Sequence, residues 1–457
     1  MFEPSAQIES LLTAVASRSP EGTSEGMQAV MDRESEFPTP LTAKLTGIAL
    51  DPYARGLAER CLDAYWSDES RQDGMLNPTP TSTPTSAGTS TAAREVIIGS
   101  GFHAAVYAAV RVLSGRPRPL VVERDKRVGG TFAMTGRPTF YLNSRNRAGT
   151  GGLAGDLGAS LNYLPGAPIQ AANVSMAEFQ TNTDMAFVIR VALAQFADVV
   201  TDAPVLSVTR GDSGAVVEIE DRGTLFAGRV IDARGLGDPD SQATANGTTL
   251  LTFVQFMQRM ATTWPLRGIG RVAVLGGGDS AKCAVESLLG IAPQPFMAAA
   301  ALDRVELIDW YAERLPSTCD QWQQEVRGRY QAIGRYLRPD RLGVRRLQVR
   351  PRRAQPVALP GMGLIEGRTY DLVILCTGNR ETPIGGLDFD SFDEYPTTDG
   401  TVIARRHYQL PVFRVGPHAR LPFTEQERQD GVADITANAV SMFRTASKTA
   451  ALAATLP

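Results

Sequence analysis

The sequence predicts an α/β protein with two domains, each built on a parallel β-sheet, and a helical extension at the N-terminus. Two segments, residues 95–113 and 271–290, run from a short apolar strand through a glycine-rich turn into an apolar helix. Each segment is followed by a later apolar strand that ends in glycine, at residues 230–235 and 372–378. Strands that alternate with helices favour parallel sheets, because parallel neighbours need a long crossover connection.

The composition is that of a globular chain and argues against several classes of partner. The 457 residues are enough for two or three domains, with 43% hydrophobic and 21% charged residues. A net charge of −3 gives no basic field for nucleic acid or an acidic membrane surface. No apolar run is long enough to span a membrane, and the first residues lack the basic start of a signal peptide. We therefore expect a cytoplasmic protein.

Histidine and cysteine are scarce, with three and four residues in the whole chain. The scattered histidines predict no metal site. No two cysteines form a C-x-x-C pair, so we expect neither a disulfide framework nor a redox disulfide, and Cys283 and Cys376 are interpreted as core residues. No constellation of side chains for acid–base or nucleophilic catalysis stands out. We therefore predict no catalytic side chain and expect an organic cofactor to supply the chemistry.

The N-terminal part differs in character from the rest. Its apolar residues lie three and four apart, as in QIESLLTAVA, and predict helices. A tract rich in proline, threonine and serine follows and predicts a linker, because it lacks the apolar content for a core. The helices are expected to dock on the remaining chain, to join copies of it, or to bind a carrier partner. The expected divisions are a helical region at residues 1–75, a linker at 76–93, a first α/β domain at 94–265 and 379–457, and an inserted second domain at 266–378.

The first glycine turn reads G-S-G-F-H-A, which is the form that a dinucleotide-binding elbow needs. Gly99 allows a tight turn after the strand, and Gly101 lets the backbone approach a pyrophosphate without a Cβ in the way. Ala104 allows the helix to pack closely on the strand. The N-terminus of that helix then presents unpaired N–H groups and a positive dipole end to phosphates. Such turns are common, so the motif by itself is weak.

A carboxylate and a glycine pair strengthen the prediction. Glu123 ends the next strand, 22 residues after Gly101, where an acid accepts hydrogen bonds from an adenosine ribose. Gly129 and Gly130 then complete an E-x5-G-G pattern. The pattern resembles the FAD signature of flavoproteins with two dinucleotide-binding domains, in which the glycine pair lies close to the cofactor diphosphate. A domain that binds only NAD lacks this pair.

The second glycine turn, residues 276–281, reads G-G-G-D-S-A and is similar to the NAD(P) loop of thioredoxin reductases. Gly235 and Gly378 end the two strands that are expected to return beneath each dinucleotide. The resemblance covers residues 94–456. It implies an FAD-binding Rossmann-type domain with an NAD(P)-binding Rossmann-type domain inserted into it.

The choice between NADH and NADPH is open at this stage. The strand RVELID ends in Asp309, where an acid would favour the free 2′-hydroxyl of NAD. Arg314 follows closely and would instead pair with a 2′-phosphate. The resemblance slightly favours NADPH.

The C-terminal part indicates which flavin chemistry to expect. The stretch from Gly431 through Asp434 and Thr436 is similar to the end of N-hydroxylating flavin monooxygenases, where a glycine–acid turn opens the last helix. In reductases of this fold a Gly-Asp pair holds the flavin ribityl phosphate, and here the matching place has Gly416 followed by proline. Class B flavin monooxygenases share the domain order. Their usual substrate fingerprints are absent, and residues 317–337 have no counterpart that we can assign.

The loop after the glycine pair should run toward the flavin ring. There Asn143 and Ser144 could bind flavin or substrate, and Arg145 and Arg147 could bind a carboxylate or a phosphate. The expected cofactor-binding residues are Gly99, Gly101, Phe102, His103, Ala104, Glu123, Arg124, Gly130, Thr131, Asn143, Val205, Gly235, Gly276, Gly278, Asp279, Ser280, Ala281, Asp309, Gly378, Gly416 and Thr436.

The resemblance implies an FAD-dependent monooxygenase that consumes NAD(P)H and dioxygen and hydroxylates a small molecule through a flavin C4a-hydroperoxide. Two alternatives remain open. One is an NAD(P)H-dependent flavoprotein reductase without a redox disulfide. The other is a flavin-binding protein without catalysis that docks a partner through the N-terminal helices. The substrate is not indicated by any motif.

Overall fold

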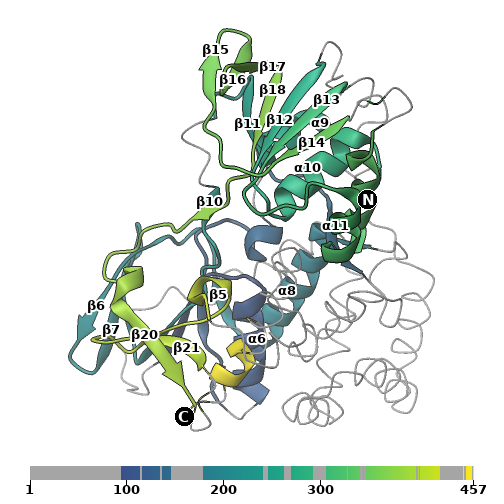
Figure 1. The fold of residues 1–457 in the computed structure, drawn as a ribbon. Helices are drawn as coiled ribbons and strands as arrows, with labels where there is room; N and C mark the ends of the chain where they lie inside the picture. The colour runs from purple at the N-terminus through teal and green to yellow at the C-terminus, as the bar shows by residue number, and fades with distance from the viewer. Residues whose placement is uncertain are drawn as a thin grey trace, which may run out of the picture.

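The computed structural model describes a two-domain α/β chain (Figure 1). The described residues are 94–113, 116–133, 136–145, 179–239, 245–261, 269–291, 305–326, 328–339, 343, 346–397, 400, 402–421, 446, 449–454 and 456. The expected helical region at 1–75, the linker at 76–93 and Thr436 lie outside them. Within these ranges no helix is both long and apolar enough to cross a membrane.

The first domain is built on a sheet of seven described strands in the order β20-β21-β22-β9-β1-β2-β5. The five strands from β22 to β5 pair in parallel, whereas β21 pairs antiparallel with both of its neighbours, β22 and the edge strand β20. Their bounds are β20 Phe392–Pro396, β21 Val402–His407, β22 Val412–Arg414, β9 Arg229–Asp232, β1 Glu95–Ile98, β2 Leu120–Val122 and β5 Asp198–Val200. The parallel arrangement that the alternation of strands and helices predicts is thus confirmed.

Both faces of this sheet are covered, because successive side chains of a strand point to opposite sides. On one face Ile97 packs with the helices α6 (Phe102–Leu113) and α8 (Asn182–Phe196). On the other face Val96 packs with a small antiparallel sheet. That sheet consists of β6 (Val205–Gly211), β7 (Gly214–Ile219) and β8 (Gly223–Ala227). The result is a three-layer domain with an apolar core on either side of the parallel strands.

The second domain repeats this plan on a smaller scale. Its described sheet is parallel throughout, in the order β11-β18-β12-β13-β14. The helices α9 and α10 cover one face, and the antiparallel sheet β15-β16-β17 covers the other. The bounds are β11 Leu250–Thr252, β18 Leu372–Leu375, β12 Arg271–Leu275, β13 Leu307–Tyr311, β14 Leu347–Arg350, α9 Phe253–Ala261, α10 Asp279–Leu289, β15 Val357–Leu359, β16 Met362–Ile365 and β17 Arg368–Tyr370.

The second domain begins earlier than the sequence indicates. β11 pairs with β18 in the second sheet, and Phe256 and Met257 of α9 are fully buried in its core. The expected boundary at residue 266 therefore assigns β11 and α9 to the wrong domain. The reason is physical: a three-residue apolar strand carries no sign of which sheet it joins until its hydrogen-bond partner is known.

Two short strands join the domains: β10 (Asp238–Pro239) pairs antiparallel with β19 (Asn379–Arg380). Figure 1 shows β10 between the two sheets. The crossing is tight, because a Cβ on Gly237 would lie 2.0 Å from the Arg380 carbonyl oxygen. Arg124 of the first domain hydrogen-bonds Asp238 and the Thr382 hydroxyl, so it contacts both connecting segments.

The segment at residues 317–337 forms two helical pieces beside α10, the α-helix α11 (Cys319–Glu325) and the 3-10 helix η4 (Gly328–Leu337). Trp322 is fully buried against Trp310 of β13, with ring centroids 5.5 Å apart. The remaining described elements are β3 (Tyr141–Arg145), paired with β4 (Phe179–Thr181), and the 3-10 turns η1 (Gly130–Phe132), η5 (Phe389–Ser391) and η6 (Pro417–Ala419). Of the expected C-terminal helix, residues 446 and 449–454 are described and are helical.

Candidate dinucleotide-binding site

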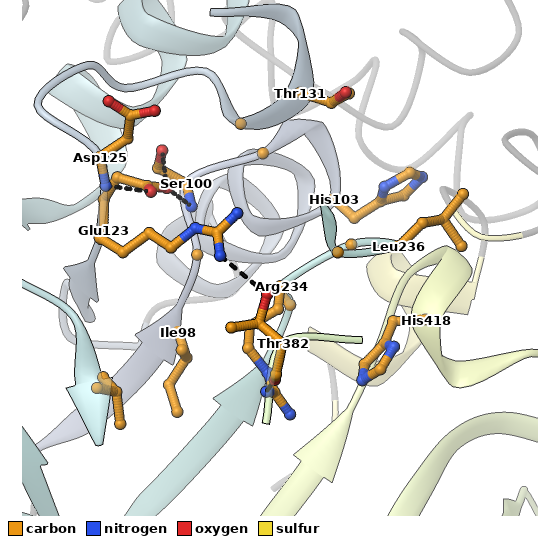
Figure 2. Close-up of a pocket in the computed structure, with 18 of the residues that line it drawn as sticks. Ile98, Ser100, His103, Glu123, Asp125, Thr131, Arg234, Leu236, Thr382 and His418 are labelled. Carbon is orange, nitrogen blue, oxygen red and sulfur yellow. Dashed lines mark hydrogen bonds between the residues drawn. The ribbon is translucent and has the colours of Figure 1, made fainter. Parts of the chain in front are cut away.

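A pocket of about 340 Å³ opens at the carboxyl ends of β1, β2 and β9 (Figure 2). Ligands of open parallel sheets bind at this edge. Ten of the residues expected from the sequence to hold a cofactor line the pocket. They are Gly99, Gly101, Phe102, His103, Glu123, Arg124, Gly130, Thr131, Val205 and Gly235.

Three glycines give the pocket its bare backbone. Gly99 has φ +94°, and a Cβ there would lie 3.0 Å from the Ala233 carbonyl oxygen of the return strand. Gly130 has φ +56°, and its Cβ would lie 2.8 Å from Gly101 Cα. A Cβ on Gly101, in contrast, would meet no atom within 4 Å. Glycine is required at the first two positions by conformation and close approach, and at Gly101 it leaves an open cradle at the start of α6.

Glu123 is tied to the glycine turn by hydrogen bonds. Its Oε2 accepts from the backbone N–H of Ser100 at 2.8 Å and from the Ser100 hydroxyl at 2.6 Å, and its Oε1 accepts from the N–H of Asp125 at 2.8 Å. The Ser100 oxygen accepts in turn from the N–H of Gly129 at 3.1 Å. Ser100 thus links the first turn, the carboxylate and the glycine pair. The sequence did not single it out, because any small residue satisfies the G-x-G pattern.

A buried cluster of charges underlies the pocket. Asp232, fully buried, accepts hydrogen bonds from Arg234 at 2.8 and 2.9 Å and from the fully buried Arg414 at 3.0 Å. Glu381 lies 3.1 Å from Arg234, 3.2 Å from Arg414 and 3.1 Å from His418 Nε2. Arg234, Glu381 and His418 also line the pocket. Figure 2 shows Arg234, Thr382 and His418 on the side of the pocket away from Thr131.

The cluster shifts the ionisation of its members. Burial would raise the pKa of Asp232, but the charges of Arg234, His418 and Arg414 outweigh it and hold that pKa well below its usual range. Burial lowers the pKa of His418, against the opposing effect of the Asp232 and Glu381 carboxylates. The sequence did not predict this cluster of charges, because its members lie on three separate stretches of the chain.

The second glycine turn has the same backbone geometry as the first and makes an equivalent hydrogen bond to the neighbouring strand. The N–H of Gly99 donates to Val122 O at 2.8 Å, and the N–H of Gly276 donates to Tyr311 O at 2.8 Å. A Cβ on Gly276 would lie 1.9 Å from the Cys376 carbonyl oxygen of its return strand, which repeats the approach of Gly99 to its own return strand. The two elbows therefore share one backbone geometry, and Val122 corresponds to Tyr311.

This correspondence identifies the residue that replaces Glu123 in the second domain. The N–H of Glu123 donates to Val200 O at 2.8 Å, and the N–H of Ala312 donates to Arg350 O at 3.0 Å, so each joins the next strand of its sheet in the same way. Ala312 therefore takes the place in the second domain that Glu123 has in the first, and its side chain carries no carboxylate.

The sequence-based role of Asp309 is wrong. β13 continues two residues beyond it, to Tyr311, and Asp309 is buried inside the second domain. Its carboxylate accepts from Arg350 Nε at 3.0 Å and from the Tyr370 hydroxyl at 2.8 Å, on the face that β15-β16-β17 cover. The strand runs on through Trp310 and Tyr311, so the residue that follows it is Ala312 rather than Asp309.

The other residues expected at the second turn lie around the start of α10. Gly278 is its N-cap and has open space around it, Ser280 is exposed, and Ala281 is fully buried. The Asp279 carboxylate accepts from Lys282 Nζ at 3.1 Å. Gly378 has φ +103° and is exposed after β18. None of these residues lines the 340 Å³ pocket of the first domain.

Three further expected residues do not line that pocket. Ala104 lies in the first turn of α6 and is fully buried, as its role in helix packing requires. Gly416 lies against His103, since a Cβ on Gly416 would be 3.1–3.5 Å from atoms of the His103 side chain. Asn143 lies on β3, and its buried Oδ1 has no hydrogen-bond partner in the part of the chain that the structure describes. A buried carbonyl oxygen of this kind indicates a missing donor, which a ligand N–H would supply.

Comparison with known proteins found similarity at the level of the fold, to solved structures. No protein-family model matches the chain, and no curated protein matches it. An ornithine N-hydroxylase of Kutzneria sp. 744, solved with reduced FAD, NADP+ and L-ornithine, is 14% identical with a TM-score of 0.47, over 79% of this chain and 98% of that one. An L-lysine 6-monooxygenase of Pseudomonas syringae is 14% identical with a TM-score of 0.47, over 80% of this chain and 100% of that one. A thioredoxin reductase of Lactococcus lactis is 15% identical with a TM-score of 0.44, over 78% of this chain and 97% of that one.

Proposed function

We propose that the protein is an FAD-dependent monooxygenase that consumes NADPH and dioxygen and hydroxylates a small molecule. The observation that carries the proposal is the pairing of Gly130 with Gly101 beside Glu123 in one pocket. A pocket with bare backbone at a helix N-terminus suits a diphosphate, and a carboxylate at the end of the neighbouring strand suits a ribose.

The pocket residues fit FAD by their chemistry. Gly99, Gly101 and Gly130 leave room for the diphosphate at the first turn of α6. Glu123 already accepts three hydrogen bonds, and two carboxylate oxygens have about four lone-pair sites, so capacity for a ribose hydroxyl remains. Arg124 and Val205 line the part of the pocket beyond β2, where the adenosine would lie.

The second glycine turn is proposed to hold NADPH rather than NADH. Ala312 occupies the place of Glu123, so no carboxylate there would repel a 2′-phosphate. The exposed Arg314 lies two residues further on and is available to pair with that phosphate. Gly278 and the start of α10 would take the diphosphate.

When bound, the flavin would accept a hydride from NADPH and activate dioxygen, so the protein needs no acid or base of its own. Its residues bind and orient the two nucleotides and exclude water. Cys283 and Cys376 do not suit a thiol relay, because burial raises the pKa of Cys283 to about 12 and raises that of Cys376 as well. This favours oxygen chemistry over disulfide reduction.

A three-part assay on the purified protein tests the proposal. We expect a yellow protein with one FAD per chain, bleaching of the flavin by NADPH without oxygen, and hydroxylated product from an amine or amino acid after oxygen is added. Bleaching followed only by hydrogen peroxide, with no product from any substrate class, would identify a reductase instead. A flavin that NADPH and NADH both fail to bleach would indicate a non-catalytic binding protein, and a colourless protein that takes up no FAD would overturn the proposal entirely.

A further inference from the structure

Arg329, in the inserted segment 317–337, is buried between the two domains. Its Nη2 lies 3.1 Å from the Glu286 carboxylate of α10, which is fully buried. Its Nη1 donates to the backbone carbonyl of Tyr141 in β3 at 2.8 Å. One guanidinium group thus contacts the helix of the second glycine turn and a strand that extends from the first domain.

Tyr330 extends this contact to the glycine turn itself. Its hydroxyl donates to the carbonyl oxygen of Asp279, the first residue of α10, at 3.2 Å, and it accepts from Arg329 Nη2 at 3.1 Å. The guanidinium carbon of Arg329 also lies 4.9 Å from the centroid of the Tyr330 ring. The chain of contacts therefore runs from the start of α10 through Tyr330 and Arg329 to β3.

The strand at the other end of this chain carries a candidate flavin contact. Asn143 lies two residues after Tyr141 on β3. Its buried Oδ1 has no hydrogen-bond partner among the described residues. Movement of β3 relative to α10 would therefore move a flavin contact relative to the nicotinamide site.

We propose that Arg329 is a positioning residue that holds β3 against the N-terminus of α10 and so sets the distance between the two cofactors for hydride transfer. The inference rests on the proposed function. It also assigns a role to the segment 317–337, which would serve as a brace between the sites. Hydride transfer requires its two atoms about 3–3.5 Å apart, so a small displacement of the brace has a large effect on rate.

Other contacts hold the domains together without Arg329, so its loss need not separate them. Gln258 of α9 donates to the Gly136 carbonyl at 2.6 Å. Phe253 of α9 and Phe140 meet edge to face, with ring centroids 6.4 Å apart. These contacts lie on α9 rather than on α10, so they do not fix the start of α10.

The same segment provides a matched control pair. Arg335 and Tyr336 repeat the neighbouring arginine and tyrosine six residues further on, with Arg335 Nη2 3.3 Å from the Tyr336 hydroxyl and the guanidinium carbon 5.0 Å from the ring centroid. Arg335 is exposed and Tyr336 is half-buried. Arg335→Met and Tyr336→Phe therefore make the same chemical changes without removing the contacts of Arg329 and Tyr330.

The test compares Arg329→Met, Arg329→Lys and Tyr330→Phe with these controls. We expect the anaerobic rate of flavin reduction at saturating NADPH to fall at least about tenfold in Arg329→Met and Tyr330→Phe, with partial recovery in Arg329→Lys, because a tenfold change needs only about 1.4 kcal/mol. The KM for NADPH and the FAD content should change little. Both control variants should keep the wild-type rate.

Hydrogen exchange supplies a readout that does not depend on activity. The amides of residues 141–145 should exchange at least several-fold faster in Arg329→Met than in wild type, and at the wild-type rate in Arg335→Met. If Arg329→Met is too unstable to purify, Tyr330→Phe serves as the test variant, because it removes a single hydroxyl group and so disturbs the fold less. Wild-type reduction rates and unchanged exchange in Tyr330→Phe would overturn the inference. If wild-type protein is not reduced by NADPH, the proposed function fails, and the exchange data still report whether the brace exists.

Discussion

At the scale of single residues, the contact between Gly130 and Gly101 is the most sensitive point of the first pocket. We expect Gly130→Ala to lose most of its FAD, because the new methyl group would lie 2.8 Å from Gly101 Cα and push the glycine pair off the diphosphate site. Its φ of +56° adds a conformational cost of roughly 1–2 kcal/mol. The ratio of flavin to protein absorbance after purification measures the loss.

Gly223→Ala is the matched control for this substitution. Gly223 also has a positive φ, +82°, but open space surrounds its Cβ direction, in the turn between β7 and β8. It should show a similar loss of stability and a normal FAD content. Equal FAD content in the two variants would contradict the assignment of Gly130 to the cofactor site.

Asp232 gives a second prediction at this scale, concerning acid stability. Its pKa is held well below the value of about 3.9 that it has in an unfolded chain. The stabilisation is therefore fully present above about pH 5 and is lost as the pH falls below about 4. We expect Asp232→Asn to cost roughly 3–5 kcal/mol at pH 7, since the buried Arg414 loses the nearer of its two carboxylate partners and keeps only Glu381. The cost should shrink toward acid pH in urea unfolding curves.

The control for the acid measurement is Asp393→Asn, on the edge strand β20. Asp393 is exposed, so its substitution should change the unfolding free energy by less than about 1 kcal/mol at every pH. An Asp232→Asn protein as stable as wild type at pH 7 would show that the cluster is not held together by this carboxylate.

At the scale of elements, the register of β13 on β12 decides which residue would face the ribose of a coenzyme bound at the second glycine turn. Leu275 pairs with Tyr311, so Ala312 follows at the place that Glu123 has in the first domain. We expect Ala312→Glu to reduce the preference for NADPH over NADH at least about tenfold, about 1.4 kcal/mol, because the carboxylate would repel the 2′-phosphate and accept a bond from a 2′-hydroxyl. The ratio of kcat/KM for the two coenzymes measures the change.

Ala312→Gln separates charge from size in this experiment. The amide has nearly the same volume as the carboxylate but no charge, so it should alter both coenzymes alike and leave the ratio within about twofold of wild type. A preference that is unchanged in Ala312→Glu would mean that the ribose lies elsewhere.

At the scale of the whole molecule, cofactor binding should be linked to folding. The pocket is formed by β1, β2, β9 and residues near Glu381 and His418, which come together only in the folded chain. FAD at 100 times its dissociation constant should therefore add about 2.7 kcal/mol to the unfolding free energy of flavin-free protein. Thermal unfolding at increasing FAD concentration measures this as a steady rise in Tm, roughly 5–10 °C for a domain of this size. No rise in wild type would contradict the pocket assignment, and Gly130→Ala should show little.

Much of the architecture was predictable because it depends on short-range pattern. The two strand–glycine–helix segments lie where the sequence analysis predicts them. Gly99 and Gly276 were recognisable because only glycine tolerates their positive φ with a carbonyl so close. Each of these features depends on residues close together in the chain, so the sequence pattern predicts it.

The sequence by itself therefore determined the fold class, the two elbows and the ten expected residues that line one pocket. Only the tertiary structure decided which sheet β11 joins and that Ala312 rather than Asp309 corresponds to Glu123. It also decided which distant residues Ser100, Asp232 and Arg329 contact. These features depend on hydrogen bonds and ion pairs between residues far apart in the chain. Such contacts leave no periodic pattern in the sequence, because they exist only once the strands have taken their register.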